Sequence, residues 1–145
     1  MRKNFTLSLS LIALVTIVAL FPMSGCKKDT TPAPGPKSIE GLWIGTIANA
    51  TSGPQFYSLS IKPDGKLTFD GMGGNQQHLG IGTWTLTGTT FTASVTTVYG
   101  LSSNIGVKQT LTAVFNSSTG TLSSGTWQNT STVTDSGTFA VTKVN

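Results

Sequence analysis

Cysteine, histidine and acidic residues are scarce in this chain of 145 residues. It contains one cysteine, one histidine and five acidic residues, and only 10% of its residues are charged. A single cysteine excludes an intrachain disulfide and a multi-cysteine zinc site, and a single histidine excludes a histidine-rich metal site. The length allows one ordinary domain. We therefore expect a single small domain without a metal or another cofactor.

Few side chains are available for catalysis. Glu40, Asp70 and Asp135 are the candidates for paired carboxylates, and the alternative is that all three are solvated at loop edges. His78 suits a general base or a hydrogen-bond donor at a pocket rim, and the alternative is an exposed loop histidine. No second histidine or downstream cysteine completes a nucleophile pair. We predict that the protein is not an enzyme, with a hydrolase as the residual alternative.

The longest apolar run lies near the N-terminus and is too short for a membrane-spanning helix. Residues 5–21 contain no charge, glycine or proline, follow the basic residues Arg2 and Lys3, and end at Pro22. A spanning helix needs about 18 or more apolar residues. A short basic stretch before a short apolar run is typical of a secretory signal peptide. We predict that residues 1–25 are removed.

The residues after this run carry a second signal. Met23-Ser24-Gly25-Cys26 resembles the lipobox of bacterial lipoproteins, although Met23 replaces the usual leucine. The resemblance implies cleavage between Gly25 and Cys26, a diacylglyceryl thioether on the Cys26 thiol, and an amide-linked third acyl chain such as palmitate. A buried core cysteine is the alternative, but the neighbouring sequence offers no core.

The residue after this cysteine bears on location. In lipoproteins an aspartate at that position can favour the inner membrane, and here it is Lys27. The resemblance therefore implies an anchor in the outer membrane of a Gram-negative bacterium, while the side of the membrane that the domain faces stays open.

Residues 26–38 form a predicted tether. Prolines at positions 32, 34 and 36 favour an extended polyproline II conformation. At about 3.1 Å per residue the segment reaches roughly 35 Å, enough to hold a small domain clear of lipid headgroups.

The remaining chain, residues 39–145, shows no helical periodicity. Threonine, serine, valine and aromatic residues occur in short runs separated by turn signals such as Pro63-Asp64-Gly65. The predicted strands span about 40–49, 55–62, 66–71, 79–87, 90–98, 107–115, 121–129 and 136–144. Hairpin-length connections predict antiparallel neighbours, and closure removes the two free edges. We predict an all-β, eight-stranded antiparallel up-and-down barrel.

Alternation along these strands identifies the residues expected to line the barrel. They are Trp43, Tyr57, Leu59, Ile61, Phe69, Phe91, Leu111, Phe115 and Phe139. Two segments between strands supply the candidate rim residues Met72, His78 and Tyr99. The glycine-rich segment 70–78 is expected to be a flexible loop, and a mobile lid is one interpretation of it.

The first predicted strand carries a family resemblance. Gly41-Leu42-Trp43 resembles the Gly-x-Trp opening of lipocalin and calycin barrels. The resemblance implies an eight-stranded barrel in which Trp43 lies inside, near the closed end. The chain departs from that family after the last strand, because no helix-forming segment follows it.

The net charge of +4 does not lie in the predicted domain. Arg2 and Lys3 belong to the signal peptide, and Lys27, Lys28 and Lys37 to the tether. The domain then has four lysines against four acidic residues. These are Lys62, Lys66, Lys108 and Lys143 against Glu40, Asp64, Asp70 and Asp135. A domain without net charge argues against nucleic acid as a partner.

Two functions are compatible with such a barrel. Eight strands enclose room for one small ligand, and the apolar lining suits an acyl chain or another small apolar molecule oriented by Tyr57 or Gln109. Alternatively, side chains fill the barrel, and a non-catalytic module binds an envelope protein or glycan through its loops. In both cases we expect a monomeric domain held at the membrane by acyl chains on Cys26.

Overall fold

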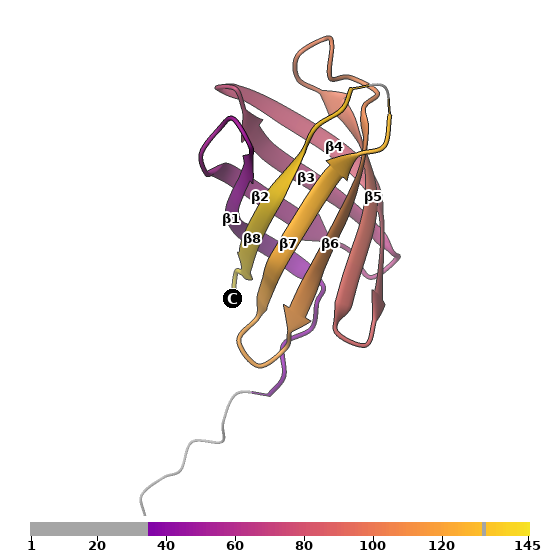
Figure 1. The fold of residues 1–145 in the computed structure, drawn as a ribbon. Coiled ribbons are helices and arrows are strands. Elements are labelled where there is room, and N and C mark those ends of the chain that lie inside the picture. The colour runs from indigo at the N-terminus through magenta and orange to yellow at the C-terminus, as the bar shows by residue number, and fades with distance from the viewer. Residues whose placement is uncertain (1–34, 132) are drawn as a thin grey trace, which may run out of the picture. The chain divides into compact units, whose positions relative to one another are not determined.

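A closed β-barrel makes up the described part of the chain, residues 35–131 and 133–145 of the computed structural model (Figure 1). Its strands are β1 (Gly41–Asn49), β2 (Gln55–Ile61), β3 (Lys66–Gly73), β4 (Gln76–Thr87), β5 (Thr90–Tyr99), β6 (Lys108–Asn116), β7 (Thr121–Asn129) and β8 (Ser136–Lys143). Each strand pairs antiparallel with the next, and β8 closes the ring on β1. The predicted all-β up-and-down barrel is confirmed.

Several predictions concern residues outside the described ranges. The signal peptide, the cleavage site, Cys26 and the tether up to residue 34 are among them, so they stay predictions. Within the described ranges, no helix is long and apolar enough to span a membrane.

The β3–β4 connection is tighter than the sequence predicts. In place of a glycine-rich loop, β3 extends to Gly73 and β4 begins at Gln76, and Met72 lies opposite Gln77 in the ladder. Gly74 and Asn75 alone turn the chain, with φ of 58° and 65°. Two left-handed residues form the hairpin turn whose twist matches that of the strands. The expected loop is therefore a paired hairpin.

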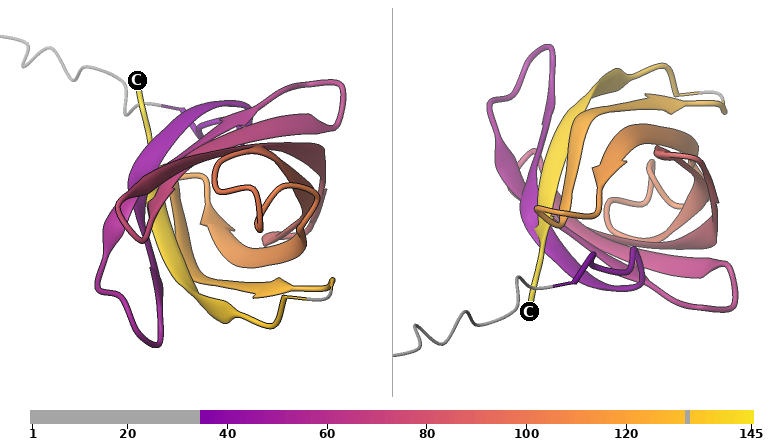
Figure 2. Two further views of the ribbon diagram at one scale, coloured as in Figure 1. Left: turned by 90° about the horizontal axis from the view of Figure 1, so that it is seen from above. Right: turned by 90° about the horizontal axis from the view of Figure 1, so that it is seen from below.

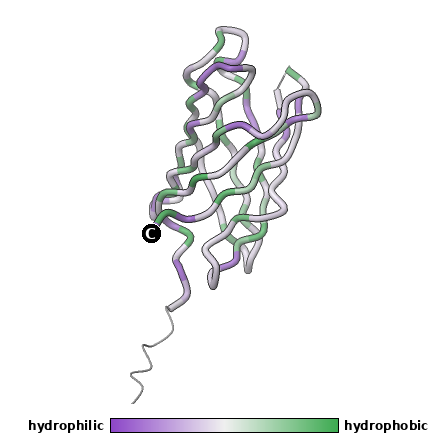
Figure 3. The backbone as a smooth tube through the Cα atoms, turned by 90° about the vertical axis from the view of Figure 1, so that its left-hand side faces the viewer, coloured by the Kyte–Doolittle hydropathy of each residue, from purple (hydrophilic) through white to green (hydrophobic). Residues whose placement is uncertain are grey.

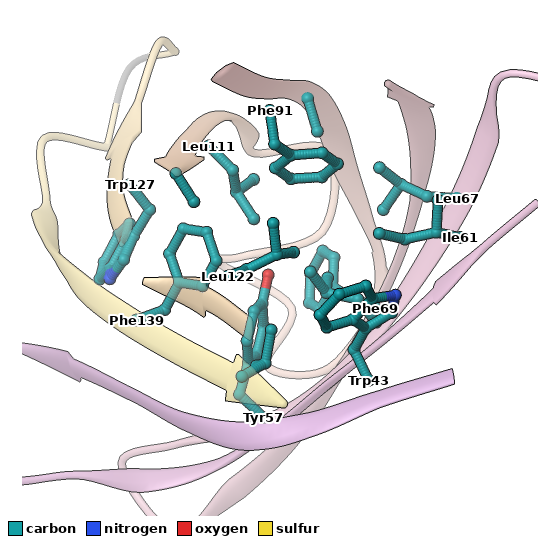
Figure 4. Packing of buried hydrophobic residues seen from close by; sticks show 14 of the residues in the cluster. Trp43, Tyr57, Ile61, Leu67, Phe69, Phe91, Leu111, Leu122, Trp127 and Phe139 are labelled. Atoms are coloured by element: carbon teal, nitrogen blue, oxygen red, sulfur yellow. The ribbon is translucent and has the colours of Figure 1, made fainter. Parts of the chain in front are cut away.

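Apolar and polar residues alternate along the strands, so one face of each fills the barrel (Figure 3). All nine residues predicted to line the barrel belong to one buried cluster. The largest fully buried side chains are Trp43, Tyr57, Leu59, Leu67, Phe91, Val95, Leu111 and Leu122. The side chains labelled in Figure 4, among them Trp43, Phe91 and Leu111, point into the middle of the barrel. Most of the interior is thus a packed core.

One end of the barrel is sealed around Trp43, which is fully buried. Its indole N–H donates to the carbonyl of Ile39 over 2.8 Å, and its ring meets Phe115 edge-on with centroids 5.9 Å apart. Ile39 itself is buried beneath it. This bond satisfies the indole donor inside an apolar core.

Both ends of the described chain lie at this closed end. The Lys37 N–H donates to the Ser117 carbonyl in the β6–β7 turn, and the Lys37 ammonium donates to the Asn145 side chain over 2.6 Å. The Lys143 ammonium donates to the Ser38 carbonyl over 2.7 Å. Residues 37–40 therefore form a strap across the closed end, and we use this name for them below.

A β-bulge in β7 changes which residues face inward. The register shifts between Leu122 and Gly125, and Ser124 adopts a left-handed φ of 51°. Leu122 is buried, and so is Trp127, which strict alternation from Leu122 would place outside. One extra residue on a strand reverses the alternation beyond it.

The opposite end of the barrel is open. Seen from above, the strands form a ring, and the β5–β6 connection curls over the interior (Figure 2). Backbone hydrogen bonds hold this connection, from Asn104 to Leu101 over 2.8 Å and from Gly106 to Thr97 over 2.8 Å. The segment 99–106, expected at the rim, lies there and covers part of the opening.

Candidate ligand cavity at the open end

A cavity of about 150 Å³ lies beneath the open end of the barrel. Strands β1 to β7 contribute to it, together with Val133 and Asp135 before β8, because the up-and-down topology brings every second connection to the same end. Its apolar lining includes Ile47, Tyr57, Phe69, Val107 and Trp127. Its polar lining includes Asn49, Gln55, His78, Thr97, Gln109, Asn129 and Asp135.

Aromatic rings form the base of this cavity. The Tyr57 ring packs between Phe69 and Phe139, with centroids 5.9 Å from each (Figure 4). Gly71, opposite Tyr57 in the ladder, leaves room for this ring, since a methyl group there would lie 2.8 Å from Tyr57 Cδ2. Trp127 closes one side and donates its indole N–H to the Ala48 carbonyl over 3.0 Å. These contacts fix the aromatic walls.

Hydrogen bonds between side chains organise the rim. The Asn49 amide donates to Asp135 Oδ2 over 3.0 Å, and the Gln109 amide donates to Asn129 Oδ1 over 3.0 Å. The first bond joins β1 to the residue that precedes β8, and the second joins β6 to β7. The polar rim is therefore held by pairs that bridge neighbouring strands.

Two polar groups of the lining lack partners among the described residues. The Gln55 Oε1 atom is buried without a hydrogen bond. The Tyr57 hydroxyl points into the barrel interior, and burial alone, without any hydrogen bond, raises its pKa above the ordinary value of 10.0. A buried polar group without a partner costs about 1–3 kcal/mol. Such groups beside a cavity offer hydrogen bonds to a ligand.

His78 lies at the rim between two glycines. Its Nε2 atom lies 3.3 Å from the Gly73 carbonyl, and a methyl group on Gly100 would collide with the imidazole. The half-buried ring lines the cavity, as does Met72. Tyr99, the third predicted rim residue, is 57% exposed and lies outside the cavity lining.

The predicted lining residues divide between core and cavity. Of the nine, only Tyr57 and Phe69 reach the cavity, while the other seven pack elsewhere in the buried cluster. Gln109, considered as an orienting group, does line it.

Sequence reasoning missed Gln55, Thr97, Asn129 and Trp127. Gln55 and Thr97 continue the inward alternation of Tyr57 and Val95, but the expected lining was chosen from apolar and aromatic side chains alone. Trp127 turns inward through the β7 bulge, for which the only sequence signal is Ser123-Ser124-Gly125 before the tryptophan.

The three candidate carboxylates do not form one site. Asp135 lies at the cavity rim, Asp70 accepts hydrogen bonds from Gln77 over 3.0 and 3.1 Å, and Glu40 belongs to the strap at the other end. Within residues 35–131 and 133–145, no group of three or more histidine, cysteine or acidic residues could hold a metal ion.

A second depression lies on the outer surface of β1, β7 and β8. Small side chains line it, among them Thr46, Ala48, Thr126, Thr138 and Ala140. Gln55 Oε1, a buried atom without a hydrogen-bond partner among the described residues, lies in the other cavity. The open end is therefore the stronger candidate site.

In comparisons with known proteins, no family model, no curated protein and no solved structure matches the chain.

Proposed function

We propose that the protein is a small-molecule binding protein that holds an apolar ligand in the open end of its barrel. The observation that supports this most directly is the cavity itself, which combines aromatic walls with the unpartnered Gln55 oxygen and Tyr57 hydroxyl. Binding sites for small molecules are typically apolar hollows with a few polar groups that orient the ligand.

The volume limits the size of the ligand. A cavity of about 150 Å³ is comparable to the engineered apolar cavities that bind benzene, whereas drug-sized ligands occupy about 300–1,000 Å³. Leu59, Leu111 and Leu122 are fully buried in the core, so a long acyl chain has no continuous path through the barrel. The proposed ligand is a single ring or a short chain.

Titrating the protein with benzyl alcohol tests this proposal, with backbone amide NMR shifts locating the binding site. We expect shifts at the open end and none at the strap. Val107→Phe should abolish binding, because Val107 is buried against the cavity and a phenyl group would fill it. Val114→Phe is the matched control, since Val114 is 46% exposed on β6. Equal binding by both variants would contradict the proposal.

We also propose that the barrel is lipocalin-like and anchored as a lipoprotein. The Gly41-x-Trp43 motif, the buried Trp43 and the eight-stranded barrel support the first part, and the lipobox-like sequence before Cys26 supports the second. Radiolabelled palmitate should be incorporated into the wild-type chain in a Gram-negative bacterium and not into Cys26→Ser. Fractionation of the envelope should place the labelled protein in the outer membrane.

An interaction module is the second candidate function. Val98, Tyr99, Leu101 and Ile105 are 42–57% exposed near the open end, and exposed apolar side chains in loops are typical of contact surfaces. This function requires no ligand. It predicts that Leu101→Ser with Ile105→Ser abolishes binding to an envelope protein or glycan, while Val107→Phe leaves that binding intact.

A further inference from the structure

The geometry points to a small amine that carries one ring as the ligand of this cavity, with its ring against Tyr57, Phe69 and Trp127 and its ammonium group on the Asp135 carboxylate. The assignment rests on the proposed binding function and names the charge class of the ligand. It follows from the Asp135 carboxylate in the cavity lining and from the absence of lysine and arginine there.

The Asp135 carboxylate can accept further hydrogen bonds. Its Oδ1 atom accepts the Ser136 N–H over 2.8 Å, and its Oδ2 atom accepts the Asn49 amide over 3.0 Å. Two carboxylate oxygens offer about four acceptor sites, so further donors can bind. The only ion pair among the described residues joins Lys66 to Asp64 in the β2–β3 turn. The Asp135 charge therefore has no cationic partner in this part of the chain.

The cavity lining contains no lysine and no arginine. Its ionisable side chains are Asp135, His78 and Tyr57, and the raised pKa of Tyr57 keeps that hydroxyl neutral. An anionic ligand such as a fatty acid would bring its carboxylate next to Asp135 without a compensating cation. Like charges at short range disfavour such a complex, whereas an ammonium group would gain a charge-assisted hydrogen bond.

The aromatic walls favour the same class of ligand. They suit the ring of the ligand, because aromatic rings pack favourably with their centroids about 4.5–7 Å apart. The amide of Gln55 can rotate about its last side-chain bond and present its unpartnered oxygen to an N–H group. The ring of the amine would occupy the volume of about 150 Å³, which suits one six-membered ring.

Three probes of nearly equal size separate charge from shape: benzylamine, benzyl alcohol and benzoate. We would measure their affinities at pH 7 by amide NMR titration of the purified protein. We expect benzylamine to bind about tenfold more tightly than benzyl alcohol, and benzoate to bind most weakly. Asp135→Asn, which keeps the size of the side chain and one acceptor oxygen, should reduce the preference for benzylamine to less than about threefold.

Two controls make the result specific. Amide NMR shifts of ligand-free Asp135→Asn that match the wild type away from position 135 show that the cavity is intact. Asp70→Asn should keep the preference for benzylamine, because Asp70 bonds Gln77 and does not line the cavity.

The outcomes distinguish this assignment from the proposed function. If benzoate binds as tightly as benzylamine, or if Asp135→Asn keeps the full preference, the amine assignment is wrong while small-molecule binding stands. If none of the probes shifts amides at the open end, the proposed binding function fails, and the amine assignment fails with it.

Discussion

Tyr57 makes the barrel less stable at alkaline pH. Burial raises the pKa of its hydroxyl above 10.0, whereas in the unfolded chain the same group ionises near pH 10. Above that pH the unfolded state binds fewer protons than the folded state. The free energy of unfolding therefore falls as pH rises, by about 1.4 kcal/mol per pH unit for this group.

We predict that Tyr57→Phe removes this loss of unfolding free energy at alkaline pH. Between pH 8 and pH 11 the wild type should lose about 1 kcal/mol more stability than the variant, measured by urea unfolding. At pH 8 the substitution should be neutral or stabilising, because it deletes a buried hydroxyl without a partner. Tyr99→Phe is the control, since Tyr99 is 57% exposed. If wild type and Tyr57→Phe lose stability equally, the Tyr57 hydroxyl is not isolated from water.

At the same scale, the sequence identifies core residues better than cavity residues. Phe91 and Leu111 lie within regularly alternating runs, and alternation alone predicts their burial. Gln55 begins β2 and Asp135 precedes β8, and a pattern of apolar residues does not identify either of these polar side chains. Their place at one cavity depends on which connections meet at the open end, and this information lies in the pairing of distant strands.

At the scale of the element, the β7 bulge determines whether the Trp127 side chain faces the interior or the outer surface of the barrel. Ser124 occupies a left-handed conformation that costs a non-glycine residue about 1–2 kcal/mol. Because the bulge reverses the alternation of β7, the sequence pattern of this strand is ambiguous, and only the register settles it.

Substitutions at Ser124 and Ser123 should have opposite effects. We predict that Ser124→Gly stabilises the protein by about 0.5–1 kcal/mol, and that Ser124→Val destabilises it by about 1–2 kcal/mol. Ser123 is exposed and lacks a positive φ, so glycine there should destabilise and valine should be tolerated. Thermal denaturation of the four variants measures these changes in stability. Effects of the same sign at both positions would mean that the bulge is not formed as described.

At the scale of the whole molecule, closure of the ring and sealing of one end are separate features. Pairing of β1 with β8 closes the ring, and the predicted lengths of the connections were enough to anticipate it. The strap seals the end, yet residues 37–40 belong to the predicted tether and to the start of the first strand. A proline-rich sequence gives no indication that its last residues dock on a turn eighty residues away, as Lys37 does on Ser117.

Removing the apolar anchor of the strap should weaken the entire barrel. Ile39 is 6% exposed, so we predict that Ile39→Ala lowers the free energy of unfolding by about 2–4 kcal/mol and shifts the fluorescence of Trp43 to longer wavelength. Leu42→Ala is the control, since Leu42 is 46% exposed and should cost less than about 0.5 kcal/mol. Equal losses in the two variants would show that the strap does not contribute to the core.

The two ends of the described residues meet at the sealed end, which has a practical consequence. Lys37 and Asn145 are hydrogen-bonded there, whereas the cavity opens at the other end. A reporter fused to the C-terminus, or a surface attached through the N-terminal segment, would leave the opening unobstructed.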